Sequence, residues 1–325
     1  MIEINYKNIR FWSMLGQNAS IWNVALPEIL ESRKDVKVLT ADLWRYSGMA
    51  KLSTTYPNQF INVGIAEQNM IGIAAGLSLE GNCVFATTYA PFITMRSMEQ
   101  VRHNLGNLKM NIKAIGSAAG FTSGLSGNAL NAIEDVAMLR AIPNMTVMSP
   151  ADSLEAIKMV LVTAINNDPT YIRLSGSTNC PIVYSKDYDF KIGKGVVLQQ
   201  GKDVAIITMG FITNEVQKAA IMMKEKYQMI PTVINMHTIK PLDYSLLDEV
   251  FKTYSLVVTV EEHNVFGGLG GAVAEYKSRF NNMPKQLFIG IEDRFYTAGS
   301  HAFMLQECGL SAELIAKKIV EKIQD

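Results

Sequence analysis

The stretch Phe60-Ile-Asn-Val-Gly-Ile-Ala-Glu-Gln-Asn-Met-Ile-Gly-Ile-Ala-Ala-Gly-Leu-Ser-Leu79 joins a short apolar run to an apolar helix. Val63-Gly64 is typical of a strand end and turn, and the helix after it has apolar residues at helical spacing: Met70, Ile73, Ala74 and Leu77. Glu67 is the only acidic residue of the stretch. Burying its carboxylate is costly unless the group has a partner or stays protonated. Glu67 is therefore a candidate functional residue, although the helix dipole alone could also favour an acid there.

Strands alternate with helices on both sides of this stretch. Apolar runs predict strands at 36–43, 83–89, 111–117, 145–149 and 170–174, and helical spacing predicts helices at 20–32, 92–105, 129–141 and 153–165. Helices that connect parallel strands cover both faces of the sheet. The first half of the chain is thus predicted to be an α/β domain with a parallel sheet.

A polar, turn-rich segment between Pro181 and Gly195 interrupts this alternation. Beyond it, strands are predicted at 204–209, 231–236, 256–260 and 286–291, separated by helices at 213–227, 243–252, 268–280 and 310–324. Domain boundaries usually fall in such segments. The predicted fold class is therefore α/β, with two parallel-sheet domains at residues 1–185 and 186–325.

The composition narrows the class of protein. The 325 residues include 30 Lys+Arg and 30 Asp+Glu, so the charge gives no indication of a nucleic acid or an anionic membrane as partner. No apolar run approaches ~18 residues, and Cys83, Cys180 and Cys308 show no CxxC spacing. The start of the chain lacks the features of a signal peptide. We expect a cytoplasmic protein, and the 18 methionines in this near-neutral chain favour burial of surface against another subunit.

Candidate ligand-binding residues follow two predicted strands. In parallel α/β sheets, ligands collect outside the carboxyl ends of the strands. Asp42 ends one strand, and Tyr89 and Phe92 follow another across Ala90-Pro91. The acid could contact a ligand or cap a turn, and the aromatic rings could stack on a flat heterocycle or pack in the core. The residue types alone leave these alternatives open.

The segment 116–128 is a loop rich in glycine and small hydroxyl residues. It lies between a strand and a helix, where substrate contacts are common, although it could also be a plain flexible connection. The chain has no GxxxxGK[ST] motif, and its partial GxGxxG pattern at Gly268 fails at Val273. It also lacks a G-D-G turn followed by a distal Asn, so no diphosphate-and-magnesium site is predicted within it. We predict no metal ligand in this chain.

Several segments, taken together and in order from about residue 18 onward, resemble the transketolase family. They are 60–70, the Tyr89/Phe92 strand end, 134–152, 239–243, 261–270 and 293–295. The resemblance covers the C-terminal half of a full-length transketolase, and it implies a thiamine diphosphate pyrimidine-binding fold followed by a transketolase C-terminal-domain-like fold. The N-terminal half, which in that family holds the magnesium and the diphosphate, is not part of the match. The chain therefore looks like one subunit of a split enzyme.

The resemblance implies roles for the candidate residues. Glu67 would bond the aminopyrimidine ring of thiamine diphosphate and favour the imino tautomer, whose exocyclic nitrogen can accept the thiazolium C2 proton. An apolar environment strengthens such a hydrogen bond. Phe92 would stack on the ring, Tyr89 would flank it, and Asp42 would lie near the cofactor. The accompanying Mg²⁺ (or Ca²⁺) would be bound mainly by the partner subunit.

Departures from the family pattern bear on the substrate. Transketolases that move sugar phosphates carry a histidine, an aspartate and a histidine at the positions of Ala118, Ser126 and Leu130. Their phosphate-binding arginine corresponds to Gly176. Such polar groups discriminate strongly, because leaving a buried one unpaired is expensive. The usual sugar phosphates are therefore not expected, and a non-phosphorylated, deoxygenated or nucleotide-linked sugar is a better hypothesis. Ser126, Asn128 and Leu130 are the predicted substrate residues.

The resemblance thus implies a transferase, namely the pyrimidine-binding subunit of a two-chain, thiamine diphosphate-dependent transketolase-like enzyme. It would transfer a two-carbon ketol unit between sugars, only together with an N-terminal transketolase-type subunit and in a heterotetramer. Two alternatives remain. The donor could be an α-keto acid such as pyruvate, as in deoxyxylulose-phosphate synthases and pyruvate dehydrogenase beta subunits. Otherwise the chain could be a non-catalytic regulatory subunit that has lost its substrate groups.

Overall fold

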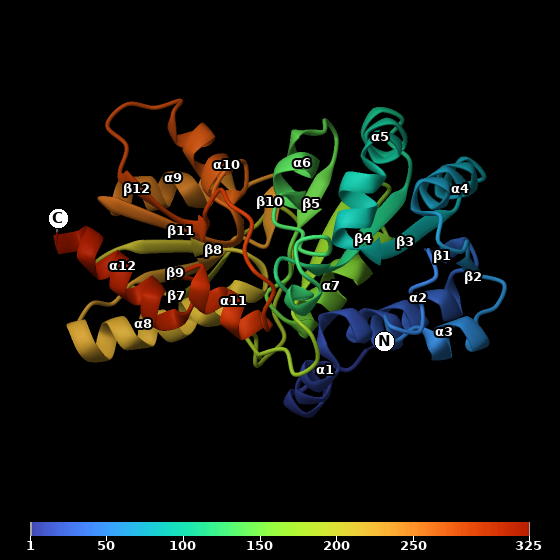
Figure 1. Ribbon diagram of the computed structural model, residues 1–325, viewed down its shortest axis with the longest axis horizontal. Helices are drawn as coiled ribbons and strands as arrows, with labels where there is room; N and C mark the ends of the chain where they lie inside the picture. Colours follow the sequence, from blue (N-terminus) through green and yellow to red (C-terminus); the bar gives the residue numbers. More distant parts are fainter. Residues whose placement is uncertain (1, 325) are drawn as a thin grey trace.

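A computed structural model describes residues 2–324 and arranges their strands in two sheets that lie side by side (Figure 1). The seven-stranded sheet has the order β10-β5-β6-β4-β3-β1-β2, and the five-stranded sheet has the order β12-β11-β8-β9-β7. The strands are β1 Val36–Thr40, β2 Phe60–Asn62, β3 Cys83–Tyr89, β4 Ile112–Ala119, β5 Thr146–Met148, β6 Thr170–Ser175, β7 Val196–Gln199, β8 Ala205–Thr208, β9 Thr232–Asn235, β10 Thr238–Lys240, β11 Leu256–Asn264 and β12 Lys285–Ile291.

Both sheets are mostly parallel, which confirms the α/β prediction, but each has one antiparallel edge strand. In the first sheet, β10 pairs antiparallel with β5. In the second, β7 pairs antiparallel with β9. β10 belongs to the second half of the sequence, so a strand from beyond residue 186 completes the first sheet.

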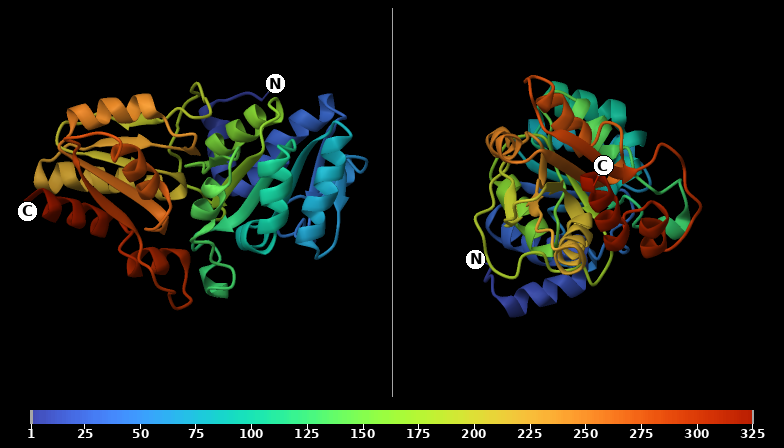
Figure 2. Two further views of the ribbon diagram at one scale, coloured as in Figure 1. Left: turned by 90° about the horizontal axis from the view of Figure 1, so that it is seen from above. Right: turned by 90° about the vertical axis from the view of Figure 1, so that its left-hand side faces the viewer.

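Helices lie on both faces of the two sheets (Figure 2). Such coverage is required because strands buried on both faces must be shielded from water. The α-helices are α1 Tyr6–Ser20, α2 Leu26–Ser32, α3 Ala50–Thr55, α4 Glu67–Leu79, α5 Met98–Gln100, α6 Asp135–Ala141, α7 Ser153–Ala164, α8 Thr213–Tyr227, α9 Tyr244–Thr253, α10 Leu269–Lys277, α11 His301–Glu307 and α12 Ala312–Gln324. Short π-helical and 3-10 segments are η1 Ile21–Ala25, η2 Phe92–Arg96, η3 Val101–Asn107, η4 Gly124–Ser126 and η5 Gly210–Ile212.

Two helix predictions were wrong in extent. Helical structure begins at Tyr6 rather than near residue 20. The side chain of Asn5 caps this start of α1. The helix predicted from residue 129 begins only at Asp135. The residues before it have other backbone partners, since the Ala132 carbonyl accepts a hydrogen bond from the Gly120 amide at 2.9 Å. The segment between η4 and α6 is therefore held as a loop beside the end of β4.

One buried apolar cluster joins the two sheets. It contains residues of the first sheet, such as Val84 and Ile112, together with residues of the second, such as Ile207 and Val257. Burial of such side chains stabilises a protein by about 1.5–3 kcal/mol each, so a shared cluster favours a fixed arrangement of the sheets. Among residues 2–324, no helix is long and apolar enough to cross a membrane.

Candidate active site

Glu67 is the first residue of α4, immediately after β2 and a turn at Gly64. Gly64 has a φ of 77°, a left-handed conformation that favours glycine, and it turns the chain from the strand into the helix. Although charged, Glu67 is only 4% exposed. Met70 and Ile71, on the following turn of α4, are completely buried. The carboxylate is therefore buried at the start of an apolar helix, although Ile65, two residues before it, is 79% exposed.

Arg96 is the ion-pair partner of Glu67. Its Nη1 donates to Glu67 Oε1 at 2.8 Å, and its side chain remains 45% exposed. The central guanidinium carbon lies 3.8 Å from the centroid of the Phe92 ring. The second carboxylate oxygen, Oε2, has no hydrogen-bond partner among residues 2–324. One oxygen of Glu67 is thus engaged, and the other remains available to a ligand.

The aromatic pair stands next to this carboxylate. Tyr89 is the last residue of β3, and Phe92 begins η2 after the turn at Ala90-Pro91. The two rings meet edge to face with centroids 5.9 Å apart. Phe92 is half-buried, and its position in η2 places Arg96 four residues later on the same side. The spacing of Phe92 and Arg96 was a sequence signal for this contact that was not recognised.

Asp42 lies two residues beyond the end of β1, with a left-handed φ of 61°. Its amide donates to Asn62 Oδ1, and Asn62 Nδ2 donates to Asp42 Oδ1, both at 3.0 Å. Asn62 Oδ1 also accepts from the Gly64 amide at 3.1 Å. Asn62, which the sequence analysis missed, thereby connects the end of β1 to the turn before Glu67. Asp42 itself is exposed.

A cavity of about 480 Å³ opens at the carboxyl ends of β3, β4 and β6 and includes Tyr89. Its lining is rich in hydroxyl groups and contains one formally charged residue, Arg45. The loop after β4 contributes Ser117, Ala118, Thr122 and Ser123 to it. The predicted substrate residues lie farther along that loop and do not line the cavity: Ser126, Asn128 and Leu130. Asn128 instead donates to the carbonyl of Tyr296 at 3.0 Å.

The second sheet fixes the same loop through Glu262. The buried carboxylate of Glu262, on β11, accepts from the Phe121 amide at 2.7 Å and pairs with His301 Nε2 at 2.9 Å. A side chain at Gly120 would collide with it, because a Cβ there would lie 2.2 Å from Glu262 Oε1. Burial alone would lower the pKa of His301, but the neighbouring carboxylate raises it above its ordinary value. Burial would likewise raise the pKa of Glu262, and the His301 charge brings it below its ordinary value.

Gly176, at the end of β6, leaves no space for a side chain. Its φ is 76°, and a Cβ there would lie 2.5 Å from the ring of Phe211. Phe211 belongs to η5 of the second half of the chain. A larger side chain at this position would therefore collide with Phe211, which fills the adjoining space.

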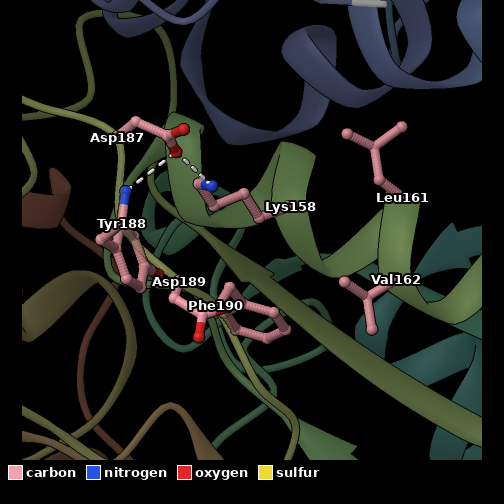
Figure 3. A pocket seen from close by; sticks show the side chains of 7 residues that line it. All are labelled: Lys158, Leu161, Val162, Asp187, Tyr188, Asp189 and Phe190. Carbon is pink, nitrogen blue, oxygen red and sulfur yellow. Dashed lines mark hydrogen bonds and ion pairs between the residues drawn. The ribbon is translucent and has the colours of Figure 1, made fainter.

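Another cavity, of about 520 Å³, lies between α7 and the segment 187–190 (Figure 3). Lys158 of α7 pairs with Asp187 at 2.5 Å across it, and the ring of Tyr188 lies beside Lys158. This cavity shares no lining residue with the cavity at Tyr89, and none of the predicted site residues lines it. We therefore place the candidate active site at the strand ends and not here.

Sequence models of two domains match most of the chain. The transketolase pyrimidine binding domain matches residues 17–180, and the transketolase C-terminal domain matches residues 193–315. Among residues 2–324, no cluster of three or more His, Cys, Asp or Glu side chains could hold a metal ion.

Curated relatives match over nearly their full length. A putative transketolase C-terminal section from Methanocaldococcus jannaschii is 37% identical over 92% of this chain and 94% of its own. A subunit of the apulose-4-phosphate transketolase from Phocaeicola vulgatus is 33% identical over 92% and 95%. The 6-deoxy-6-sulfo-D-fructose transketolase subunit SqwH from Clostridium sp. is 34% identical over 88% of each chain.

A similar solved structure is a split-gene transketolase described as an inactive beta4 tetramer. It is 35% identical and superposes with a TM-score of 0.84, covering 95% of this chain and 98% of that one. The 1-deoxy-D-xylulose-5-phosphate synthase of Idiomarina loihiensis also matches, at 31% identity over 94% of this chain. That match spans only 48% of the synthase.

Proposed function

Because this chain belongs to the transketolase family, we propose that it is the pyrimidine-binding subunit of a two-chain, thiamine diphosphate-dependent transketolase. The chain is a transketolase-like transferase of the split type, as its relatives are. Residues 1–185 would form the pyrimidine-binding domain and residues 186–325 the C-terminal domain. The observation that carries the proposal is the buried carboxylate of Glu67, which lies near Phe92 and Tyr89 at the carboxyl ends of the strands.

The residues present fit the aminopyrimidine end of the cofactor. Glu67 offers a buried carboxylate with one oxygen available for a ring nitrogen. Phe92 and Tyr89 supply aromatic surface for a flat heterocycle. The diphosphate and the Mg²⁺ would be held mainly by the other subunit.

Each of these residues would have a defined task. Thiamine diphosphate, when bound, would supply the nucleophilic carbon that two-carbon transfer requires. Glu67 would hold a proton at the ring nitrogen, and its burial would keep competing water away from that hydrogen bond. Phe92 would fix the plane of the ring, and Tyr89, which also lines the hydroxyl-rich cavity, would flank it. Asp42, held by Asn62, would line the entrance beside the cofactor.

The partner would be an N-terminal transketolase-type subunit, and the complete assembly a heterotetramer. Relatives of this length are named as subunits or sections of transketolases, and one is solved as a tetramer of beta chains alone, described as inactive. An inactive beta assembly is the behaviour that this proposal expects of the isolated chain.

The substrates would be sugars other than the usual sugar phosphates of transketolases. Two relatives are named for apulose-4-phosphate and for 6-deoxy-6-sulfo-D-fructose. Ala118, Ser126, Leu130 and Gly176 stand where the family's usual phosphate-sugar contacts would be. Ser126, Asn128 and Leu130 could approach a substrate only where the partner chain extends the cavity towards them.

Reconstitution tests the proposal. The purified chain is mixed with an N-terminal-type subunit, thiamine diphosphate and Mg²⁺, and carbon-labelled ketose or carbon-labelled pyruvate is supplied as donor. We expect labelled two-carbon transfer from the ketose by the pair and none by either chain alone. Release of carbon dioxide from pyruvate would instead favour the α-keto acid reaction, which the match to deoxyxylulose-phosphate synthases keeps as the second candidate. Full activity of this chain alone would contradict the two-chain proposal.

A further inference from the structure

The lining of the cavity at Tyr89 contains a positively charged side chain and no negatively charged one. Of its lining residues, Arg45 alone carries a formal charge at neutral pH. The others are small, apolar or hydroxyl-bearing: Leu15, Asn18, Ala19, Tyr46, Ser47, Gly48, Tyr89, Ser117, Ala118, Thr122, Ser123, Leu174, Gly176, Ser177 and Thr178. A cavity that contains a cation and no carboxylate favours an anionic ligand.

The guanidinium of Arg45 has no carboxylate partner among residues 2–324. Its central carbon lies 4.8 Å from the ring centroid of Trp44, a contact that supports the group without neutralising its charge. Backbone hydrogen bonds hold the loop that carries it, since the Met49 amide donates to the Trp44 carbonyl at 2.8 Å and the Gly48 amide to the Arg45 carbonyl at 3.3 Å. The Arg45 guanidinium therefore lies over the Trp44 ring, and its N–H groups make no hydrogen bond within residues 2–324.

Hydroxyl groups complete the lining. The side chains of Ser123, Ser177 and Thr178 make no hydrogen bond within the described residues. Hydroxyl groups of this kind donate readily to sugar or phosphoryl oxygens. At the end of β6, the ring of Phe211 leaves no space for a basic side chain at position 176. Among the described residues that line this cavity, Arg45 is thus the one cation that could compensate a ligand's negative charge.

We propose that Arg45 binds a tetrahedral anionic group, a phosphate or a sulfonate, at the end of the sugar away from the reacting carbonyl. The planar fork of a guanidinium matches such an oxyanion with paired N–H donors. This inference rests on the proposed function, because that function makes the cavity beside Tyr89 the substrate cavity. It makes Arg45 a specificity-determining residue for the charge of the substrate.

The kinetic test uses the reconstituted pair with R45A, R45Q and R45K. The substrates are a ketose phosphate, the corresponding sulfonate sugar and the same ketose without a charged group. For R45A and R45Q, KM for the charged sugars should rise about 10- to 100-fold, the range of one charge-assisted contact, with kcat nearly unchanged. KM of R45K for the charged sugars should lie between the values of wild type and R45A. KM for the neutral ketose should not change in any variant. The phosphate and sulfonate arms show which anion the site prefers.

R279A is the matched control, since Arg279 is also an exposed guanidinium over an aromatic ring, 5.7 Å from Tyr276. It should leave every KM unchanged. A rise in KM for charged and neutral sugars alike in R45A would overturn the proposal, because it would show a merely structural role.

A binding measurement separates this inference from the proposed function. Inorganic phosphate is titrated into the reconstituted pair by calorimetry, without any turnover. Wild-type protein should bind it at least about 10-fold more tightly than R45A. Equal affinity would overturn the Arg45 site even if ketol transfer occurs. Arg45-dependent phosphate binding without ketol transfer would support the site and reject the proposed function.

Discussion

The Arg96 guanidinium donates to the buried carboxylate of Glu67 at 2.8 Å and lies over the ring of Phe92. One side chain thus contacts two of the three residues assigned to the aminopyrimidine, Glu67 and Phe92. A buried carboxylate needs such a partner, and the planar guanidinium provides a charge and a flat surface together.

We expect R96A to destabilise the chain by about 1–2 kcal/mol, because hydrogen bonds to charged groups contribute roughly 1.5–3 kcal/mol and half-exposed Arg96 should lie near the lower end. Urea unfolding of the purified chain measures the change. R96K, which keeps the charge but not the planar contact with Phe92, should lie between. R102A is the control, since Arg102 is exposed and its side chain makes no hydrogen bond or ion pair in the described residues. Equal losses of unfolding free energy in R96A and R102A would show that the Arg96–Glu67 ion pair does not stabilise the chain.

Arg173 and Asp135 form a completely buried ion pair, with Arg173 Nε 2.9 Å from Asp135 Oδ2. Arg173 Nη2 also donates to the carbonyls of Ala132 and Glu262, so it connects the first sheet to β11. D135A would leave this cation buried without its partner, and we expect a loss of about 3–5 kcal/mol in unfolding free energy. E275A, which breaks the exposed pair with Arg140, should cost less than about 1 kcal/mol. Comparable losses in the two variants would contradict this account.

His301 and Glu262 should make stability depend on pH. The pKa of His301 is raised mainly by Glu262, with a smaller contribution from Glu215, while burial and Arg173 oppose the shift. A raised histidine pKa means that the stabilisation is fully present below pH ~6.5 and is lost as pH rises through the higher folded value. The stability difference between wild type and H301Q should therefore be largest near pH ~6 and shrink towards pH ~9. A difference that stays constant over this range would contradict the ion pair.

The packing of Gly176 against Phe211 predicts a coupled pair of substitutions. G176A should destabilise the chain by about 1–3 kcal/mol, because the backbone is left-handed and the new Cβ meets the ring. In an F211A background the collision is removed, so the same substitution should cost at least ~1 kcal/mol less. Thermal or urea unfolding of the four proteins completes the double-mutant cycle. Additive costs would show that Phe211 does not exclude a side chain from position 176.

Much of the fold could be predicted from periodicity. The long helices α7 and α8 and the buried strands β3 and β6 carry strong apolar patterns, and their predicted limits lie within one or two residues of those observed. The short edge strands β7 and β10 were missed. Each has only three or four residues and forms because a neighbouring strand offers hydrogen bonds, a tertiary effect that a local pattern does not contain.

The candidate site was predicted in part. Glu67, Tyr89 and Phe92 do lie together, because their strands end at the same edge of the sheet. Arg96, Asn62 and Arg45 were missed, since each matters through a contact between segments that only the folded chain brings together. The roles of Glu67, Tyr89 and Phe92 stay predictions, as do those of Asp42, Ser126, Asn128 and Leu130.

The turnover of E67Q in the reconstituted pair tests the central claim most directly. Glutamine keeps the shape of the side chain but cannot hold the proton as a carboxylate does, so ketol transfer should fall by about 10²- to 10⁴-fold while the subunits still assemble. E99Q, at an exposed carboxylate on α5, should keep wild-type turnover. If E67Q turns over as fast as wild type and E99Q, Glu67 does not perform the chemistry assigned to it.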